Sequence, residues 1–291
     1  MERCDGVSGK RVLGPEMTMD ELKERELELL DTFDAFAKAH DLRYWLSFGT
    51  LIGAMRHGGF IPWDDDIDLV MPASDYFRMV ELVDGGAEVG ENCRLAAAGI
   101  RKGAPCHVTF GKLYDTRSVA FQDELCPSCQ KKVQEGVWID LFPLCGVSDD
   151  DEEAKASIAE LDHNWSFIRL ATYKLDKASN PIKTLARLLL VLPVRLRGFT
   201  YYLRKRDELM KALPDYRSVK RSIIPSEPWY YLKSEDFMDT DHAVFEGREL
   251  PIPSGWDSAL TTWWGDWRQL PPEDKRYTKH TFKVYHLEQE D

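Results

Sequence analysis

Cysteine is scarce in this chain, and no long apolar run is present. Six cysteines are spread over 291 residues. No stretch of about 18 consecutive apolar residues occurs, which is the length that a membrane-spanning helix needs. The opening residues, MERCDGVSGKRVLG, also lack the apolar centre of a secretory signal peptide. We therefore expect reduced thiols, no spanning helix and a cytoplasmic protein that is at most peripheral at the inner face of the membrane.

An excess of basic residues is also missing. The 50 Asp and Glu residues outnumber the 38 Lys and Arg residues, and the pI is near 5.2. Nucleic-acid binders need a basic surface, so this composition excludes a general role in binding nucleic acid. An acidic protein that handles phosphates needs cations to bridge the two sets of negative charge.

Internal repeats and low-complexity linkers are absent too, and 43% of the residues are hydrophobic, which is enough for a sizeable core. Changes in composition predict four segments along the chain. These are an N-terminal tail (1–17), a core (18–148), a helical and basic insertion (149–215), and a C-terminal region that packs on the core (216–291).

Local patterns predict the elements of the core. Thr18 and Glu21 form a capping box that opens a periodic helix to about His40. The aromatic segment RYWLSF is typical of a strand that ends at Gly49-Thr50, with a short helix, TLIGAMRH, after it. Further expected elements are the strands IDLVM, TFGKLYD and GVWIDLFPL (the last closing at Pro143), a helix from Ser74 to about Val83, and a helix that opens at Asp149–Glu153.

The segment GFIPWDDDIDLVM, residues 59–71, places four carboxylates in five positions. Like charges at this spacing repel one another and lose hydration if the strand is buried, and a shared cation relieves both costs. Period-two alternation puts Asp66 and Asp68 on one face of a strand, with Ile67 opposite. Asp140 lies between apolar neighbours in a third strand. We predict that Asp66, Asp68 and Asp140 hold one or two Mg²⁺ ions, or Mn²⁺ in their place, together with phosphates.

The order of these features is more specific than any one of them. A strand that ends in Gly49-Thr50 at a helix start offers backbone N–H groups to a phosphate. The nucleotidyltransferase fold has these features in the same order: a Gly-Thr turn, then Asp-x-Asp on a strand, then an Asp on a distant strand. We therefore expect an α/β (α+β) class with a nucleotidyltransferase-like mixed sheet, flanking helices, a helical insertion and an irregular C-terminal region.

Two segments, GTLIGAMRHGGFIPWDDDIDLVM and GVWIDLFPL, resemble the LicD family of phosphotransferases, which is related to the phosphocholine transferases and more distantly to the fukutin-related sugar phosphotransferases. The resemblance covers about residues 20–145 and returns in WWGDWRQLPPEDKRYTKH. It implies Mg²⁺-dependent transfer of a phosphorylated group, such as phosphocholine from CDP-choline, to a hydroxyl of a cell-surface glycan or its lipid-linked precursor. Lipopolysaccharide and teichoic acid are glycans of this kind.

Residue roles follow from this resemblance and from the chemistry together. Asp64 or Asp140 would accept the proton of the attacking hydroxyl, whereas Asp65 alternates to the opposite side and is left out. An unpaired lysine is costly on a core strand, which favours a phosphate contact for Lys112 over a structural salt bridge. Trp63 offers the aromatic face that a quaternary ammonium needs. The residues expected to bind substrate are Gly49, Thr50, Arg56, Trp63 and Lys112.

Other functions and sites remain open on the sequence. A nucleotidyltransferase or a glycosyltransferase can use the same Asp-x-Asp site, although a glycosyltransferase usually has a βαβ half before it. A calcium loop fits poorly, because Leu69 stands where glycine is needed and Asp75 where glutamate is usual. Cys126 and Cys129 have the spacing of half a zinc site, but no second half at short spacing exists.

Basic charge gathers in residues 170–211, which hold ten Lys and Arg against three Asp and Glu. The centre of this segment is apolar, and Pro193 interrupts it. A helix here either lies in a membrane interface, with arginines at its edges, or is an ordinary core helix. The residues expected to form this peripheral membrane contact, within about 180–211, are Leu185, Leu188, Leu189 and Leu192 with Arg187, Arg195 and Arg197.

Overall fold

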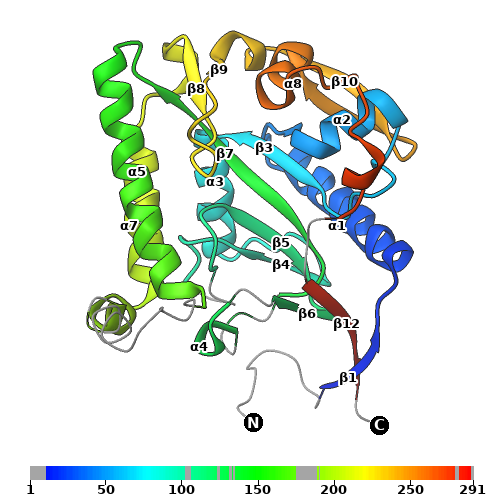
Figure 1. Ribbon diagram of the computed structural model, residues 1–291. Coiled ribbons are helices and arrows are strands. Elements are labelled where there is room, and N and C mark those ends of the chain that lie inside the picture. Colours follow the sequence, from blue (N-terminus) through cyan, green and yellow to red (C-terminus); the bar gives the residue numbers. More distant parts are fainter. Residues whose placement is uncertain are drawn as a thin grey trace.

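A mixed β-sheet lies at the centre of the computed structural model (Figure 1), which describes residues 11–101, 106–122, 125–130, 133, 135–174, 189, 191–278 and 282–289. The predicted α/β class, with a mixed sheet and flanking helices, is confirmed. Among the described strands of this sheet, β3 and β7 run parallel and the other pairs are antiparallel. The spatial order is β2 (Trp45–Leu46), β3 (Asp68–Pro72), β7 (Trp138–Val147), β5 (Gly111–Asp115) and β4 (Cys93–Ala96), with β8 (Arg221–Ile223) and β9 (Leu232–Lys233) continuing from β7.

The long strand β7 connects the parts of this sheet. It pairs with β3, β5 and β8, and all of its residues except Asp140 are buried. The expectation that it closes at Pro143 is wrong. Pro143 pairs with β3, and the strand continues because Cys145 and Val147 are buried and pair with β8. A half-buried Asp140 in a strand that is otherwise buried marks the face on which the polar site lies.

The helices flank the sheet on two sides (Figure 1). Long α5 and α7 lie side by side at the left of the view, and α1 and α2 lie at the right. The capping box is confirmed, since the Thr18 amide donates to Glu21 Oε2 at 2.8 Å and the Glu21 amide donates to Thr18 Oγ1 at 3.3 Å. No helix in the described ranges is both long and apolar enough to cross a bilayer. The helices are α1 (Met19–Ala39), α2 (Phe48–His57), α3 (Ala73–Asp84), α4 (Pro127–Gln130), α5 (Asp151–Thr172), α7 (Phe199–Ala212) and α8 (Trp256–Trp264), with short 3₁₀ turns η1 (Tyr216–Ser218), η2 (Ser234–Phe237) and η3 (Glu273–Lys275).

The start of α2 differs from the expectation. The strand before it is only two residues long, and Ser47 is already the N-cap of the helix. Gly49 therefore lies in the first turn of α2 and not at the end of a strand. Phe48, just before it, has a φ of +44°, a left-handed value that is rare for a bulky residue. The chain thus turns sharply at Phe48 and brings Gly49 close to the acidic segment.

The two ends of the described chain meet in a second sheet. Strand β12 (Phe282–Gln289) lies between β1 (Arg11–Glu16) and β6 (Ser118–Gln122), and all pairs are antiparallel. Residues 11–16, expected to be part of a tail, therefore form a strand. A hairpin, β10 (Thr240–Phe245) and β11 (Arg248–Pro253), packs near β2, where the Trp45 indole N–H donates to Thr240 Oγ1 at 2.9 Å. The segment boundaries expected from composition stay predictions.

Candidate active site

The acidic segment lies in the loop that joins α2 to β3. Carboxylate oxygens of Asp64, Asp65 and Asp66 lie within 4.8 Å of one another. Asp65 is 4% exposed, and its Oδ2 accepts a hydrogen bond of 2.6 Å from the Thr278 hydroxyl. The expectation that Asp65 points to the opposite side is wrong, because these residues precede the strand and the alternation of a strand does not apply to them.

Asp68 and Asp140 lie next to each other on the parallel strands β3 and β7. Their Cα atoms are register partners, and the Asp140 amide donates to the Ile67 carbonyl at 2.9 Å. Register partners on neighbouring strands project from the same face of a sheet. Ile67 is fully buried, whereas Asp66 and Asp68 are half-buried. The structure thus makes Asp68 and Asp140 neighbours, whereas the described ligand atoms that lie within 4.8 Å of one another include Asp66 but not Asp68 or Asp140. The role of these three residues as metal ligands stays a prediction.

Electrostatic crowding is strongest at Asp68. Burial raises the pKa of its carboxyl well above the ordinary value, and the negative charges of Asp66, Asp140 and Asp64 raise it further. Lys112 acts in the opposite direction. These side chains are therefore close enough to repel one another inside the fold, and either protons or a cation must reduce the repulsion.

Lys112 lies beside this cluster and not at an open surface. Its Nζ is 3.6 Å from Asp140 Oδ1 and 3.7 Å from the centroid of the Trp138 ring, and the residue is 4% exposed. The ion pair with Asp140 is thus present, although the sequence favoured a phosphate contact over such a pair. The reason is the register, since Lys112 and Asp140 are Cα partners on β5 and β7.

Glu26 is a buried carboxylate that the sequence analysis did not consider. It lies on the core-facing side of α1 and is 2% exposed. Burial raises the pKa of its carboxyl well above the ordinary value, and the charges of Asp66, Asp65 and Asp140 add to this. A signal existed in the pattern, because Glu26 is one helical turn from Leu22 and Leu29 on the apolar stripe.

The donor set suits a hard divalent cation. The converging groups are carboxylate oxygens, which Mg²⁺ prefers, and sulfur and imidazole ligands are absent from the Asp64–Asp66 group. The residues present therefore fit Mg²⁺.

Gly49 and Thr50 hold the cluster from the side of α2. A Cβ atom on residue 49 would lie 2.6 Å from Asp64 Oδ2, so only glycine permits the observed approach of Asp64 to the helix. The Thr50 hydroxyl is buried and accepts a hydrogen bond of 2.8 Å from the Asp68 amide. Thr50 thus lies behind Asp68 and supports it, and its contact with substrate stays a prediction.

Two arginines border the acidic segment. Arg56, at the C-terminal end of α2, donates to the Trp267 carbonyl at 2.9 Å. Burial lowers the pKa of its guanidinium, and the nearby charge of Arg276 lowers it further, so the two cations are neighbours. The Arg276 guanidinium is also 5.7 Å from the centroid of the half-buried Trp63 ring. The sequence analysis proposed Arg56 and Trp63 and missed Arg276, which lies more than 200 positions away.

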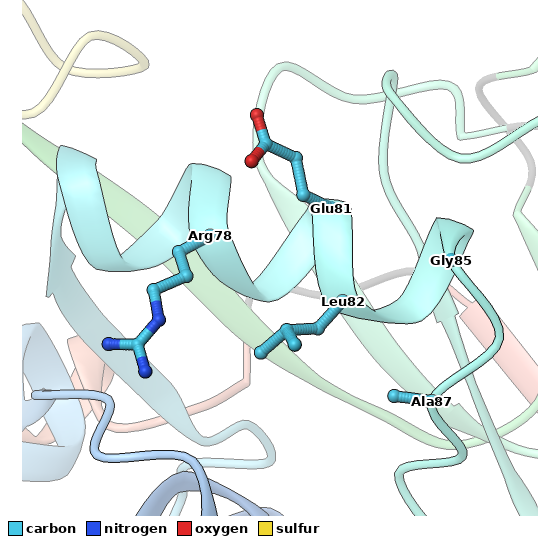
Figure 2. A pocket seen from close by; sticks show the side chains of 5 residues that line it. All are labelled: Arg78, Glu81, Leu82, Gly85 and Ala87. Carbon is cyan, nitrogen blue, oxygen red and sulfur yellow. The ribbon is translucent and has the colours of Figure 1, made fainter.

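A surface hollow lies apart from this site. It has a volume of about 460 Å³, and the side chains of Arg78, Glu81 and Leu82 border it along the last turns of α3, with Gly85 and Ala87 beyond (Figure 2). None of these residues belongs to the acidic segment or to β7. We therefore place the candidate active site at the carboxylate cluster and not in the hollow.

Cys126 and Cys129 do not join the cluster of potential metal ligands. Both thiols are buried near the Ala171 carbonyl, with Sγ–O distances of 3.9 and 3.6 Å. Among the residues that the structure describes, the group Asp64–Asp66 is the one set of three potential ligands that converges. Whether Cys126 and Cys129 bind a metal stays open.

Comparisons with known proteins test the family resemblance. The family model described as "LicD/FKTN/FKRP, nucleotidyltransferase domain" matches residues 41–168. The lipopolysaccharide cholinephosphotransferase LicD of Haemophilus influenzae is 26% identical over 287 residues, which covers 91% of this chain and 98% of that protein.

Two eukaryotic relatives match over shorter lengths. The human ribitol 5-phosphate transferase FKRP is 47% identical over 53 residues, covering 18% of this chain and 10% of that protein. Mannosyltransferase regulator 14 of Saccharomyces cerevisiae is 28% identical over 165 residues, covering 54% of this chain and 16% of that protein. The resemblance to the LicD family that the two motifs indicate is confirmed, since residues 41–168 are similar to the model of the LicD/FKTN/FKRP nucleotidyltransferase domain.

Proposed function

We propose that this protein is a Mg²⁺-dependent phosphotransferase that moves a phosphorylated group from a CDP-activated donor to a hydroxyl of a glycan or of its lipid-linked precursor. The observation that carries the proposal is the convergence of Asp64, Asp65 and Asp66 beside Gly49, next to the register partners Asp68 and Asp140, in a segment that matches the family model. The names of two relatives, a cholinephosphotransferase and a ribitol 5-phosphate transferase, both describe the transfer of a phosphorylated group.

The residues divide the chemistry among them. Mg²⁺ held by Asp66, Asp68 and Asp140 would neutralise phosphate oxygens during an in-line displacement. The acceptor hydroxyl oxygen forms a bond to the phosphorus that carries the transferred group, and the bond from that phosphorus to the bridging oxygen breaks. CMP leaves with that oxygen and its electron pair. The proton of the hydroxyl goes to Asp64, because Asp140 is engaged by Lys112.

Arg56 and Arg276 would bind the diphosphate of the donor. Two neighbouring guanidiniums repel each other, and an anion between them removes that repulsion and accepts paired hydrogen bonds. Thr278, two residues after Arg276, donates to Asp65, so the C-terminal segment is fixed against the acidic loop. This geometry supports a diphosphate that reaches from the cation site to the two arginines.

We expect Arg276→Gln to raise the KM for the donor about tenfold with a smaller change in kcat, because a ground-state contact to the donor is lost. Steady-state kinetics with varied donor concentration measures this split. Arg268→Gln is the matched control. Arg268 is an exposed arginine of the same C-terminal segment as Arg276, and it pairs with Asp257 at 2.7 Å. Equal donor KM values for wild type and Arg276→Gln would remove Arg276 from the donor site.

A panel of donors tests the reaction class. The full chain is incubated with CDP-choline, CDP-ribitol and other CDP-activated donors, with a glycan acceptor and MgCl₂, and the nucleotide product is identified by chromatography. Release of CMP that depends on acceptor and on Mg²⁺ is the expected result. Release of CDP would indicate glycosyl transfer, and release of pyrophosphate from CTP would indicate nucleotidyl transfer, and either result would replace the proposal.

A peripheral contact with anionic lipid is the second part of the proposal. Residues 191–197 are helical, with Val191 and Val194 buried against the protein and Leu192 and Leu196 exposed by 55% and 78%. Leu189 is 66% exposed and Tyr201 is 45% exposed, and the Arg197 guanidinium is 4.2 Å from the Tyr201 ring centroid. An apolar stripe with basic neighbours in an acidic chain suits an anionic membrane surface.

The structure changes which residues this contact uses. Arg195, expected at the edge of the membrane helix, donates to the Leu170 and Tyr173 carbonyls at 3.2 and 2.9 Å. It therefore closes the C-terminal end of α5 and is not available to lipid. Leu185, Arg187 and Leu188 lie outside the described residues.

We expect the Leu192→Ser/Leu196→Ser double variant to lose most of its binding to anionic vesicles, because about 25 cal/mol is lost per Å² of apolar contact. Co-sedimentation with phosphatidylglycerol and with phosphatidylcholine vesicles, at low and high salt, measures binding. Wild-type binding should be selective for the anionic vesicles and fall with salt. Leu270→Ser, which changes an exposed leucine elsewhere, is the control. Wild type that stays in the supernatant under all conditions contradicts the contact.

A further inference from the structure

The tip of the β10–β11 hairpin lies against the segment that leads from α2 into the acidic loop. Strand β10 lies beside α2 at the upper right of Figure 1. The Glu246 amide donates to the Gly58 carbonyl at 2.9 Å, and the Phe60 amide donates to Glu246 Oε1 at 3.0 Å. The Phe60 and Phe245 rings pack edge to face, with their centroids 5.0 Å apart. The hairpin tip therefore holds the chain by two hydrogen bonds and a ring contact, four residues before Asp64.

Glu246 has a backbone conformation that other residues adopt more easily. Residues 246 and 247 form a two-residue turn between Phe245 and Arg248, and their φ values are +49° and +75°. Both central positions of such a turn need a positive φ, which asparagine and glycine tolerate and glutamate does not favour. Backbone strain of this kind is concentrated at functional sites. The Glu246 side chain, which reaches Phe60, is thus a candidate for a functional role.

Gly59 makes room for the Glu246 carboxylate. Gly59 is buried, and a Cβ atom on it would overlap Glu246 Oε1, so any other residue would displace the carboxylate. The hairpin is itself fixed to α1. The Arg248 guanidinium donates to both Asp31 carboxylate oxygens, at 2.6 and 2.8 Å, and to the Glu246 carbonyl at 2.9 Å. The carboxylate therefore lies between a fixed hairpin and a glycine of the segment before the acidic loop.

The chain between Phe60 and the aspartates has little freedom to move on its own. Ile61 is buried, and its carbonyl accepts a hydrogen bond of 2.9 Å from the Asp64 amide. Asp65 is held separately by the Thr278 hydroxyl. A shift of Phe60 is therefore passed through this turn to Asp64. The proposed reaction uses the Asp64 carboxylate as the proton acceptor, so such a shift acts on the rate.

We propose that Glu246 is a positioning residue of the candidate active site, which fixes Phe60 and through it the Asp64 carboxylate. The inference rests on the proposed phosphotransfer and goes beyond it, because Glu246 lies outside the segment 41–168 that matches the family model. It gives the C-terminal region a part in the reaction besides donor binding. Glu246 acts through Phe60 and not on the donor, so its loss should change kcat more than the donor KM.

Glu246→Asn separates this role from a structural one. Asparagine is favoured at the first central position of this turn, so the Tm should equal or exceed that of wild type. The asparagine side chain is shorter by one CH₂ group and does not reach the Phe60 amide. We expect kcat to fall about tenfold or more, with a smaller change in donor KM, and the Phe60 amide to exchange its hydrogen faster. Steady-state kinetics, thermal unfolding and hydrogen exchange of the full chain measure these quantities.

Three further variants complete the test. Glu246→Gln keeps the length of the side chain and an acceptor oxygen, and should retain most of the wild-type kcat and the slow exchange at Phe60. Glu249→Asn makes the same change as Glu246→Asn at an exposed position of the same hairpin, and should leave kcat unchanged. Gly59→Ala displaces the Glu246 carboxylate from the opposite side and should lower kcat as Glu246→Asn does. The two effects should not add in the double variant, because both remove the same contact.

The outcomes separate this inference from the proposed function. A Glu246→Asn variant with wild-type Tm and wild-type kcat would overturn the role of Glu246 and leave the proposed phosphotransfer in place. If Glu246→Asn does not fold, Gly59→Ala decides, and wild-type kcat in that variant would overturn the role equally. Wild type that transfers no phosphorylated group would overturn the proposed function. In that case the exchange of the Phe60 amide in Glu246→Asn still shows whether Glu246 holds the segment before the acidic loop, and unchanged exchange would overturn that contact too.

Discussion

Replacing Asp68 with asparagine should lower kcat by about 10³-fold or more, because a charge aimed at the transferring phosphate is lost together with a metal ligand. Asparagine has nearly the same shape, and the Asp68 amide still donates to Thr50, so the strand should form as before. Single-turnover transfer from a CDP-activated donor, measured alongside circular dichroism, gives both quantities. Asp75→Asn, on the neighbouring helix α3, is a control for a carboxylate outside the cluster. A folded Asp68→Asn variant with near-normal activity would contradict the site.

Asp68→Asn should lower kcat, but without metal it should make the folded chain more stable at neutral pH. Because the folded-state pKa of Asp68 is raised, the folded chain binds a proton that the unfolded chain releases above the ordinary value of 3.8. The stability contributed by this group is present below that value and is lost as the pH rises through the folded-state pKa. In EDTA, wild type should therefore lose more stability between pH 5 and pH 8 than Asp68→Asn does. Both pH values lie about one to four units above the ordinary pKa of an aspartate. Excess MgCl₂ should reduce this difference. If the Tm of Asp68→Asn in EDTA is far below the Tm of wild type in EDTA, the Asp68 carboxylate stabilises the fold, and this prediction is wrong.

The parts of the fold that follow from neighbouring residues were predictable. The capping box at Thr18 depends on a residue three positions away, and α1 begins where the sequence places it. The acidic segment is a local run, so its position next to β3 was predicted as well. Gly49 was placed in the wrong element, because the turn at Phe48 depends on its packing against Phe142 and Trp263, at ring distances of 5.4 and 4.6 Å.

The remaining site residues depend on contacts between distant segments. Arg276 and Thr278 reach the acidic loop only because the C-terminal segment folds back over α2, and no periodicity encodes that path. Lys112 was assigned to phosphate because its pairing with Asp140 depends on the register of β5 against β7. Glu26 was not considered, because the aspartates whose charges act on its carboxyl lie about 40 or more residues away in the chain.

Gly49→Ala tests whether catalysis needs the close approach of the Asp64 carboxylate to the start of α2. The added Cβ would lie 2.6 Å from Asp64 Oδ2, which is nearer than two such atoms approach, so the carboxylate must move. The displaced group is the end of a side chain, so the Tm should change little. A shift of about 1 Å at a catalytic group costs about 10²-fold in rate, and we expect a loss of that size in kcat.

The matched control for this variant is Gly14→Ala. Its Cβ would also meet a carboxylate, at 3.0 Å from Glu288 Oε1, but on β1 and away from the acidic loop. Both variants therefore add the same methyl group against the same kind of side chain, and only one of them displaces a residue of the site. If Gly49→Ala retains the wild-type kcat, Asp64 does not need its observed position, and the assignment of the proton acceptor to Asp64 fails. If Gly14→Ala loses activity to the same degree, the loss arises from the change of a glycine in general and carries no information about the site.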